Sequence, residues 1–125
     1  MASSVKEKLV EYMAPEFQDV DGDINYRKLA HGLTIRIKDL SVAVHKTTRS
    51  LEKNYKSRNI QRDLRKISYI WILLRDMLGP GSDILMWLKS PNPDFDGLSP
   101  LDMICKGKSE AVIDYLSNIK TGQLA

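Results

Sequence analysis

Apolar residues recur along this chain at the three- and four-residue spacing of helices, and no segment alternates as a strand would. The longest such pattern lies between Ser57 and Gly79. Its apolar positions are Ile60, Leu64, Ile67, Trp71, Leu74 and Leu78. One stripe of this length predicts a long central helix in an all-α fold. Tyr69, Ile70 and Ile72 widen its apolar surface and indicate a buried dimer face as well.

Helix start and stop signals divide the region before this helix into short helices. Asn25 can cap a helix that Gly32 ends, and Thr34 can cap a second helix over IRIKDLSVAV. After a turn at residues 45–46, Thr47 can cap a third helix over TRSLEKN. Two short helices joined by a tight turn are the pattern of a helix-turn-helix unit. We therefore expect a helix-turn-helix N-terminal half.

The first residues of the chain carry weaker signals. A capping box opens residues 4–13 and predicts a helix that ends before Pro15. The turn-rich residues 15–25 hold three alternate aspartates with the spacing of a calcium loop. However, Ile24 and Ala30 stand where such a loop requires glycine and glutamate. We therefore interpret this segment as a solvated loop.

Prolines and glycines divide the region after the central helix. Ser82 can cap a short helix that runs through Lys89, and Pro91 and Pro93 prevent that helix from continuing. Gly97 then allows another turn.

A second helix start follows directly. Ser99, Pro100 and Asp102 have the spacing of an N-cap, a proline at the first helical position and a capping-box partner. Gly107 predicts an early end, and Ser109 opens the last helix. The predicted buried face of that helix consists of Val112, Tyr115, Leu116 and Ile119. These signals predict a small helical C-terminal domain.

Charge is distributed unevenly along the chain. The 125 residues carry a net charge of +3, with 42% hydrophobic and 28% charged residues, as in ordinary globular proteins. Residues 27–66 hold twelve basic and three acidic residues, whereas both flanking regions are acidic. A central block this basic favours a polyanionic partner.

The predicted helix-turn-helix lies within this basic block. Leu40, Val44 and Leu51 supply apolar contacts between its two helices, and Ser41 is small enough for close approach. The candidate DNA-binding residues lie at or after the start of the second helix: Lys46, Thr47, Thr48, Arg49, Ser50, Lys53, Lys56 and Arg58. Arg49 is the candidate to read a guanine, and the other cations suit phosphates.

The spacing of prolines, glycines and capping residues in the C-terminal region resembles that of the C-terminal toxin-binding domain of the Xre, MbcA and ParS antitoxins. The resemblance rests on residues 87–93 (WLKSPNP), Gly97, residues 99–102 (SPLD), and the run from Ala111 to Gly122. The chain departs from the family pattern where Phe95 and Asp96 replace a usual leucine and glycine, and where Asn118 stands near a common arginine. The preceding block resembles the degenerate helix-turn-helix of the same family. There, Arg49-Ser50 matches a frequent arginine-threonine pair, and His45 and Lys46 replace a usual glycine and valine.

This resemblance implies a type II antitoxin that binds a RES-domain toxin, which consumes NAD, and represses its own operon, as a homodimer. The final helix and residues 120–125 would lie near the entrance of the toxin's active-site cleft. The prolines would hold residues 92–95 in a stiff surface loop, which lowers the ordering cost of binding. The candidate toxin-binding residues are Trp87, Pro91, Asn92, Pro93, Phe95, Ser99, Asn118 and Lys120.

Two domains follow from these patterns: residues 1–66 with the helix-turn-helix, and residues 67–125 for toxin binding. The alternative is a stand-alone helix-turn-helix regulator whose C-terminal half only dimerises.

Other classes of function lack sequence support. The two histidines and the single Cys105 form no ligand cluster, so we expect no metal, no cofactor and no enzymatic activity. No apolar run reaches the length of a membrane span. With one cysteine and no secretory signal pattern, we expect a cytoplasmic protein.

Overall fold

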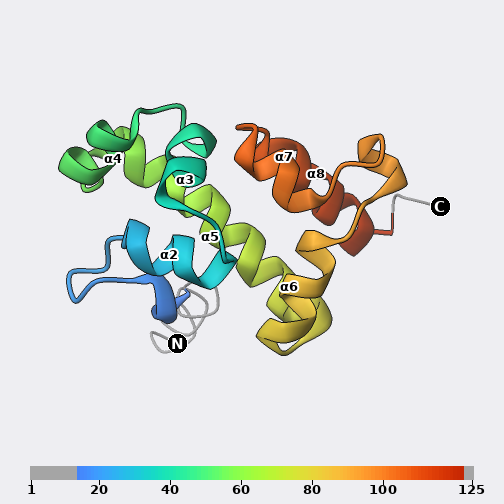
Figure 1. Cartoon of the computed structure of the whole chain (residues 1–125). Helices are drawn as coiled ribbons and strands as arrows, with labels where there is room; N and C mark the ends of the chain where they lie inside the picture. Colours follow the sequence, from blue (N-terminus) through green and yellow to red (C-terminus); the bar gives the residue numbers. More distant parts are fainter. Residues whose placement is uncertain (1–13, 123–125) are drawn as a thin grey trace, which may run out of the picture.

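The computed structural model describes residues 14–122, which form helices arranged around one long helix (Figure 1). The elements are η1 (Pro15–Phe17), α2 (Tyr26–Leu33), α3 (Ile37–Ala43), α4 (Thr48–Asn54), α5 (Arg58–Leu78), α6 (Gly81–Lys89), η2 (Pro93–Phe95), α7 (Pro100–Cys105) and α8 (Ser109–Lys120). Within residues 14–122 there is no strand, only one isolated bridge between Gln18 and Ile24. The predicted all-α fold is confirmed. The helix predicted at residues 4–13 lies outside the described residues.

The long helix α5 begins and ends where the sequence predicts. The Ser57 hydroxyl accepts a hydrogen bond from the backbone N–H of Ile60, and Gly79 follows the last residue with φ of +86°. Such a backbone angle suits a residue without a Cβ. Five of the six residues in the predicted stripe are buried, whereas the last, Leu78, is 37% exposed. The apolar periodicity therefore identified both the helix and its buried face.

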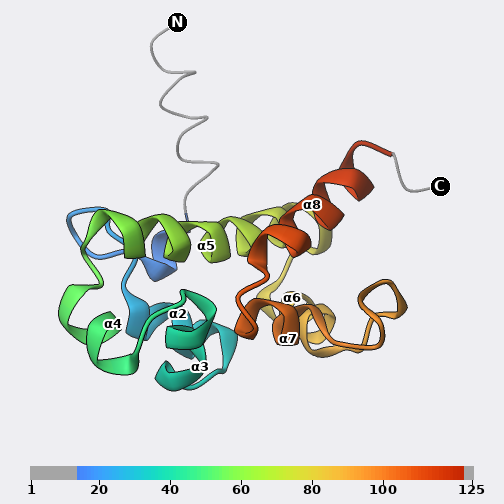
Figure 2. The ribbon, with the colours of Figure 1, turned by 90° about the horizontal axis from the view of Figure 1, so that it is seen from above.

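The remaining helices cover α5 from two sides. Figure 2 shows α8 lying alongside α5, with α2, α3 and α4 gathered beside its first part and α6 and α7 beside its second part. In addition, α3 contacts α7 directly. The two halves of the chain therefore share one helix and also touch each other, so no flexible linker separates them.

The apolar residues that widen the stripe of α5 pack against other helices of the same chain. Ile70 and Ile72 are both buried, because α6 and α8 pack on α5. The prediction that this width forms a dimer face is therefore wrong for these two residues. Burying them within the chain stabilises the fold by roughly 1.5–3 kcal/mol each.

Within residues 14–122, three non-glycine residues lie in the left-handed backbone region: Thr34 after α2 and two residues in later turns. His45, between α3 and α4, has φ of +60°, and Asp96, after η2, has φ of +56°. These are the positions where the antitoxin pattern usually has glycine. Histidine and aspartate adopt this conformation more readily than most residues. Both turns therefore keep the backbone shape that glycine would favour.

Two predicted helix starts are wrong. Thr34 has φ of +57° and ends α2, and α3 instead begins after Arg36, whose backbone N–H donates to the Asp39 carboxylate at 3.1 Å. The helix α6 begins at Gly81, one residue before Ser82, because Pro80 takes the extended N-cap position.

Gly32 was predicted to end α2, but it lies inside this helix. A Cβ at this position would collide with the ring of Phe17. That ring is buried and meets Trp71 in a T-shaped, edge-to-face contact at a centroid distance of 5.2 Å. Gly32 therefore serves the close approach of η1 to α2, and a periodicity argument could not detect this role.

Gly32→Ala should lower the free energy of unfolding by about 1–3 kcal/mol, because the buried Phe17 ring has no room to move. This sign is opposite to the usual effect of replacing a helical glycine by alanine. Gly81→Ala is the control, since its Cβ would meet Trp71 at an ordinary 3.5 Å. Urea unfolding of both variants measures the difference, and equal stability of the two would contradict the packing described for Phe17.

Candidate functional site

The turn between α3 and α4 is built by caps and tight packing. The Thr47 hydroxyl accepts from the backbone N–H of Ser50 at 3.1 Å and caps α4. Leu40, Val44 and Leu51 are buried. The hydroxyls of Ser41 and Thr48 lie 3.3 Å apart. This close approach is the one predicted from the small size of Ser41. The Thr48 hydroxyl is therefore engaged by Ser41, and that of Thr47 by the backbone of Ser50.

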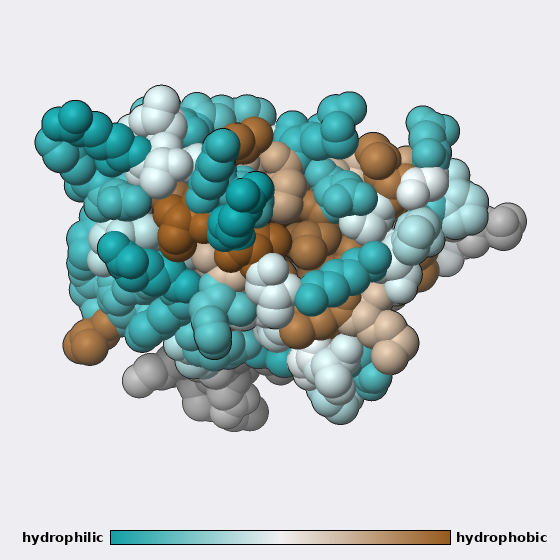
Figure 3. Space-filling model, viewed as in Figure 1, coloured by the Kyte–Doolittle hydropathy of each residue, from teal (hydrophilic) through white to brown (hydrophobic). Residues whose placement is uncertain are grey.

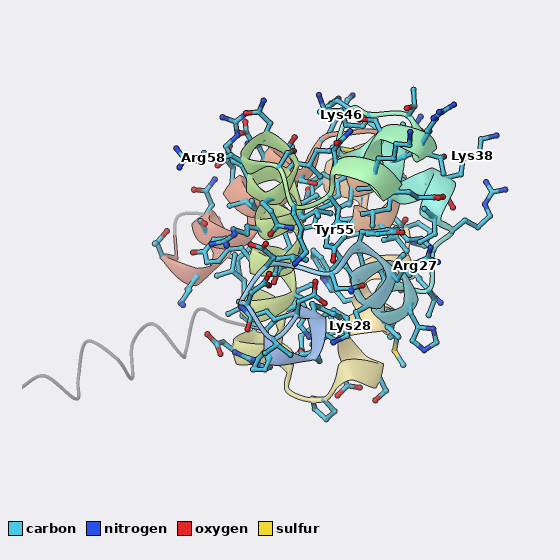
Figure 4. All side chains as sticks on the ribbon, turned by 90° about the vertical axis from the view of Figure 1, so that its left-hand side faces the viewer. Arg27, Lys28, Lys38, Lys46, Tyr55 and Arg58 are labelled. Atoms are coloured by element: carbon cyan, nitrogen blue, oxygen red, sulfur yellow. The ribbon has the colours of Figure 1, made fainter. Side chains whose placement is uncertain are left out.

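Cationic side chains surround this end of the molecule. Of the predicted DNA-binding residues, Lys46, Arg49, Lys53 and Arg58 are exposed, and Ser50 is half-buried. Figure 4 looks at this end and shows further basic side chains from α2 and α3. These are Arg27, Lys28 and Lys38, all exposed. The charge count of residues 27–66 included these three, but the motif alone did not select them.

Lys56, a further predicted DNA contact, is engaged by an acidic loop. Its Nζ donates to the Asp21 carboxylate at 2.5 Å and lies 3.9 Å from the Asp19 carboxylate. The hydrogen bond with Asp21 is the main reason that the pKa of Lys56 is raised, and the same bond lowers the pKa of Asp21. The loop at residues 19–23 therefore offsets part of the positive charge beside α4.

Asp19 fixes this loop to the core of the N-terminal half. Its carboxylate accepts from Asn25 Nδ2 at 2.9 Å and from the Tyr55 hydroxyl at 2.7 Å. These bonds, that of Asn25 first, lower the pKa of Asp19. The buried Gln61 completes the anchor, because its side chain bonds both backbone groups of Ile24 and the carbonyl of Tyr55. Sequence reasoning treated the loop as solvated and missed Gln61.

No metal or thiol chemistry is evident in the part of the chain that the structure describes. Residues 14–122 contain no group of three or more potential metal-ligating side chains. The third loop aspartate, Asp23, lies 3.8 Å from the guanidinium of Arg65. Burial raises the pKa of the Cys105 thiol to about 11, so it is protonated and unreactive near neutral pH.

Three aromatic rings form the centre of the C-terminal surface. Trp87 is half-buried and stacks on Tyr115, with centroids 6.4 Å apart and planes 27° apart. Phe95 meets the same tyrosine at 4.9 Å. Phe95 was expected on the surface of the loop, but it is only 8% exposed because it packs under this tyrosine. The contact of Phe95 with the toxin stays a prediction. The burial of this side chain in the free chain does not favour such a contact.

Asn92 holds the proline-rich loop in shape. Its side-chain oxygen accepts from the backbone N–H of Asp94 at 2.9 Å, and its carbonyl accepts from Phe95 and Gly97. The Asp94 carboxylate in turn accepts from the Tyr115 hydroxyl at 2.8 Å. Pro91 and Pro93 are exposed. The loop is therefore internally bonded and presents its prolines outward, as the sequence predicts.

The other predicted toxin-binding residues differ in accessibility. Ser99 is buried and forms the predicted capping box with Asp102, through two 3.0 Å hydrogen bonds. Asn118 is half-buried and Lys120 is exposed, both near the end of α8. Trp87, the proline loop and α8 therefore lie together, whereas Ser99 serves the start of α7.

The two candidate surfaces lie at opposite ends of the molecule. In Figure 1, α4 is at one end and the loop after α6 is at the other, with α5 between them. Figure 3 shows a mostly hydrophilic surface over the α4 end and an apolar strip across the middle of the same face. The two candidate surfaces are therefore separated by the length of α5.

Comparison with known proteins identifies the second half of the chain. Residues 73–122 match the family model described as the antitoxin Xre/MbcA/ParS C-terminal toxin-binding domain. No curated protein and no solved structure matched the chain significantly. The matched segment begins within α5 and includes α6 to α8. Among the described residues, no helix is both long enough and apolar enough to cross a bilayer.

The hydrogen bond between Tyr55 and Asp19 gives a pH-dependent prediction. A carboxylate whose pKa is lowered by folding stabilises the protein above its ordinary pKa of 3.8, and this contribution is lost as the pH falls through the lower folded value. Tyr55→Phe should therefore lower the melting temperature at pH 7, and this deficit should shrink below pH 3.8. The control Tyr26→Phe removes a hydroxyl that forms no hydrogen bond within residues 14–122. A deficit that is constant from pH 7 to pH 3 would contradict the assigned bond.

Proposed function

We propose that this chain is the antitoxin of a type II toxin–antitoxin pair, because residues 73–122 match the antitoxin Xre/MbcA/ParS C-terminal toxin-binding domain. The partner is a toxin with a RES domain, which consumes NAD. The antitoxin neutralises it by covering its active-site cleft. The family match over α6, α7 and α8 is the observation that carries this proposal.

The shape of the C-terminal surface supports this role. The loop that carries Pro91 and Pro93 is exposed and fixed by its own hydrogen bonds, so binding orders few additional groups. The half-buried Trp87 stacks on Tyr115, whose hydroxyl donates to Asp94 of this loop, and α8 continues from Tyr115 to the exposed Lys120. An aromatic anchor next to a stiff, exposed loop is a common basis for a protein interface.

We also propose that the N-terminal half binds the operator of the antitoxin's own operon as part of a homodimer. Arg49 and Lys53 are exposed on α4, and Figure 4 shows Arg27, Lys28 and Lys38 of α2 and α3 at the same end of the molecule. A second helix presented from a capped turn suits insertion into the major groove. The basic end of the molecule supports this part of the proposal independently of the family match.

The alternative is a regulator that binds DNA and whose C-terminal half only dimerises. The exposed cations around α4 favour DNA binding under both hypotheses. Toxin binding is therefore the property that distinguishes the antitoxin from the regulator. Coexpression with a RES-domain toxin from a neighbouring gene should restore growth if the chain is its antitoxin. If the purified proteins fail to form a complex, the antitoxin proposal is removed.

The loop makes a quantitative prediction for toxin binding. Replacing Pro91 and Pro93 by alanine should weaken the affinity for the toxin about fourfold to thirtyfold, because each proline limits the free loop by about 0.4–1 kcal/mol. The control is Pro80→Ala, an exposed proline at the start of α6. Calorimetric titration measures the affinity, and melting temperatures check the fold. An unchanged affinity in the double variant would show that the toxin does not use this loop.

The basic end makes a separate prediction for DNA. Arg49→Ala should relax preference for one base pair by about 1–3 kcal/mol, whereas Lys53→Ala should weaken binding to all sequences and reduce the salt slope by about 1. Fluorescence anisotropy with operator and scrambled duplexes measures both effects. Lys89→Ala, an exposed lysine of α6, is the control. If neither α4 variant differs from this control, then α4 is not the recognition helix.

A further inference from the structure

A cleft opens between the two halves of the chain, next to the turn that precedes α4. Its volume is about 460 Å³. One wall comes from the end of α3 and the turn after it, a second from α5, and the third from the turn before α8 and the first residues of α8. The lining residues used below are His45, Arg62, Lys66, Lys108, Ser109 and Glu110.

Ser109, the first residue of α8, has a buried hydroxyl without a partner. The residue is 7% exposed, and its Oγ forms no hydrogen bond with any described residue. A buried hydroxyl without a hydrogen bond lowers the stability of a protein. Native proteins contain only a few such groups, and each one requires an explanation. An acceptor in the cleft, beside this residue, would satisfy it.

The start of α8 supplies further donors at the same place. The N-cap residue is Lys108, whose side chain forms no capping hydrogen bond. The first backbone N–H groups of a helix have no partner within that helix and point along its axis. Together with the helix dipole, they favour a bound anion.

The charges around the cleft leave an excess of positive groups. Lys66 is already paired, because its Nζ lies 2.7 Å from the Glu110 carboxylate and 3.8 Å from that of Asp63. By contrast, neither Arg62 nor Lys108 forms an ion pair with any described residue. Lys108 therefore flanks the helix start and the unpartnered hydroxyl without an ion-pair partner among the described residues. Arg62 adds positive charge there as well, and the pKa of Glu110 is lowered by the hydrogen bond from Lys66 and also by this charge.

We propose that this cleft binds a small phosphate-bearing ligand. The Ser109 hydroxyl and the first backbone N–H groups of α8 donate to phosphate oxygens, and Arg62 and Lys108 balance their charge. This site does not depend on the function proposed above. Because His45 comes from the turn before α4 and Gly107 lies against its ring, an occupied cleft contacts both halves of the chain.

The first test is a titration of the whole chain with inorganic phosphate, followed by two-dimensional ¹H–¹⁵N NMR. The amide signals of Ser109 and Glu110 should shift and saturate. Ser109→Ala should weaken binding by about tenfold or more, as expected for a lost hydrogen bond to a charged group. In the absence of phosphate, the same variant should be no less stable than the unchanged chain, since it removes an unsatisfied group. Ser117→Ala, on the same helix but outside the cleft, is the control.

A second pair of variants separates a site from general charge attraction. Lys108→Gln should weaken phosphate binding, whereas Lys106→Gln, an exposed lysine two residues earlier, should not. A parallel titration with AMP distinguishes the source of the phosphate: tighter binding of AMP assigns the cleft to a nucleotide, and equal binding assigns it to free phosphate. Shifts that do not saturate, or that survive Ser109→Ala and Lys108→Gln unchanged, would overturn the proposal.

Discussion

The burial of α5 is the constraint on which the rest of the structure depends. Its second half has apolar residues on several sides, and α6 and α8 must both pack on it to remove Ile67, Ile70 and Ile72 from water. At about 25 cal/mol per Å² of apolar surface, this burial outweighs any single polar contact in the chain. The C-terminal domain is therefore built on a helix that begins in the basic half.

This shared helix fixes how the two candidate surfaces relate. Because α5 is continuous from Arg58 to Leu78 and α3 also contacts α7, the basic end and the proline loop are held apart at a fixed distance. The ring of His45 against Gly107 marks the second point of contact between the halves.

The acidic loop before α2 neutralises part of the positive charge on the neighbouring surface. A count of charged residues along the sequence does not show this effect. Asp19 accepts hydrogen bonds from Asn25 and Tyr55, and Asp21 accepts one from Lys56. The buried Gln61 fixes the loop backbone. One cation of the basic block is thereby neutralised in the free protein. Arg49 and Lys53 remain as exposed charges on α4. The net charge of a segment is thus a poor guide to which of its cations are accessible.

The sequence by itself determined the all-α class, the bounds of α5, the caps at Thr47 and Ser99, and the similarity of residues 73–122 to the antitoxin toxin-binding domain. These features depend on local periodicity and on side chains within four residues of one another, which a sequence records directly. Only the tertiary structure decided that Phe95 is buried, that Gly32 accommodates Phe17, that Ile70 and Ile72 serve the monomer, and that Ser109 lies without a partner beside a cationic cleft. Each of these facts depends on contacts between residues far apart in the chain, and local spacing carries no information about which distant surfaces meet.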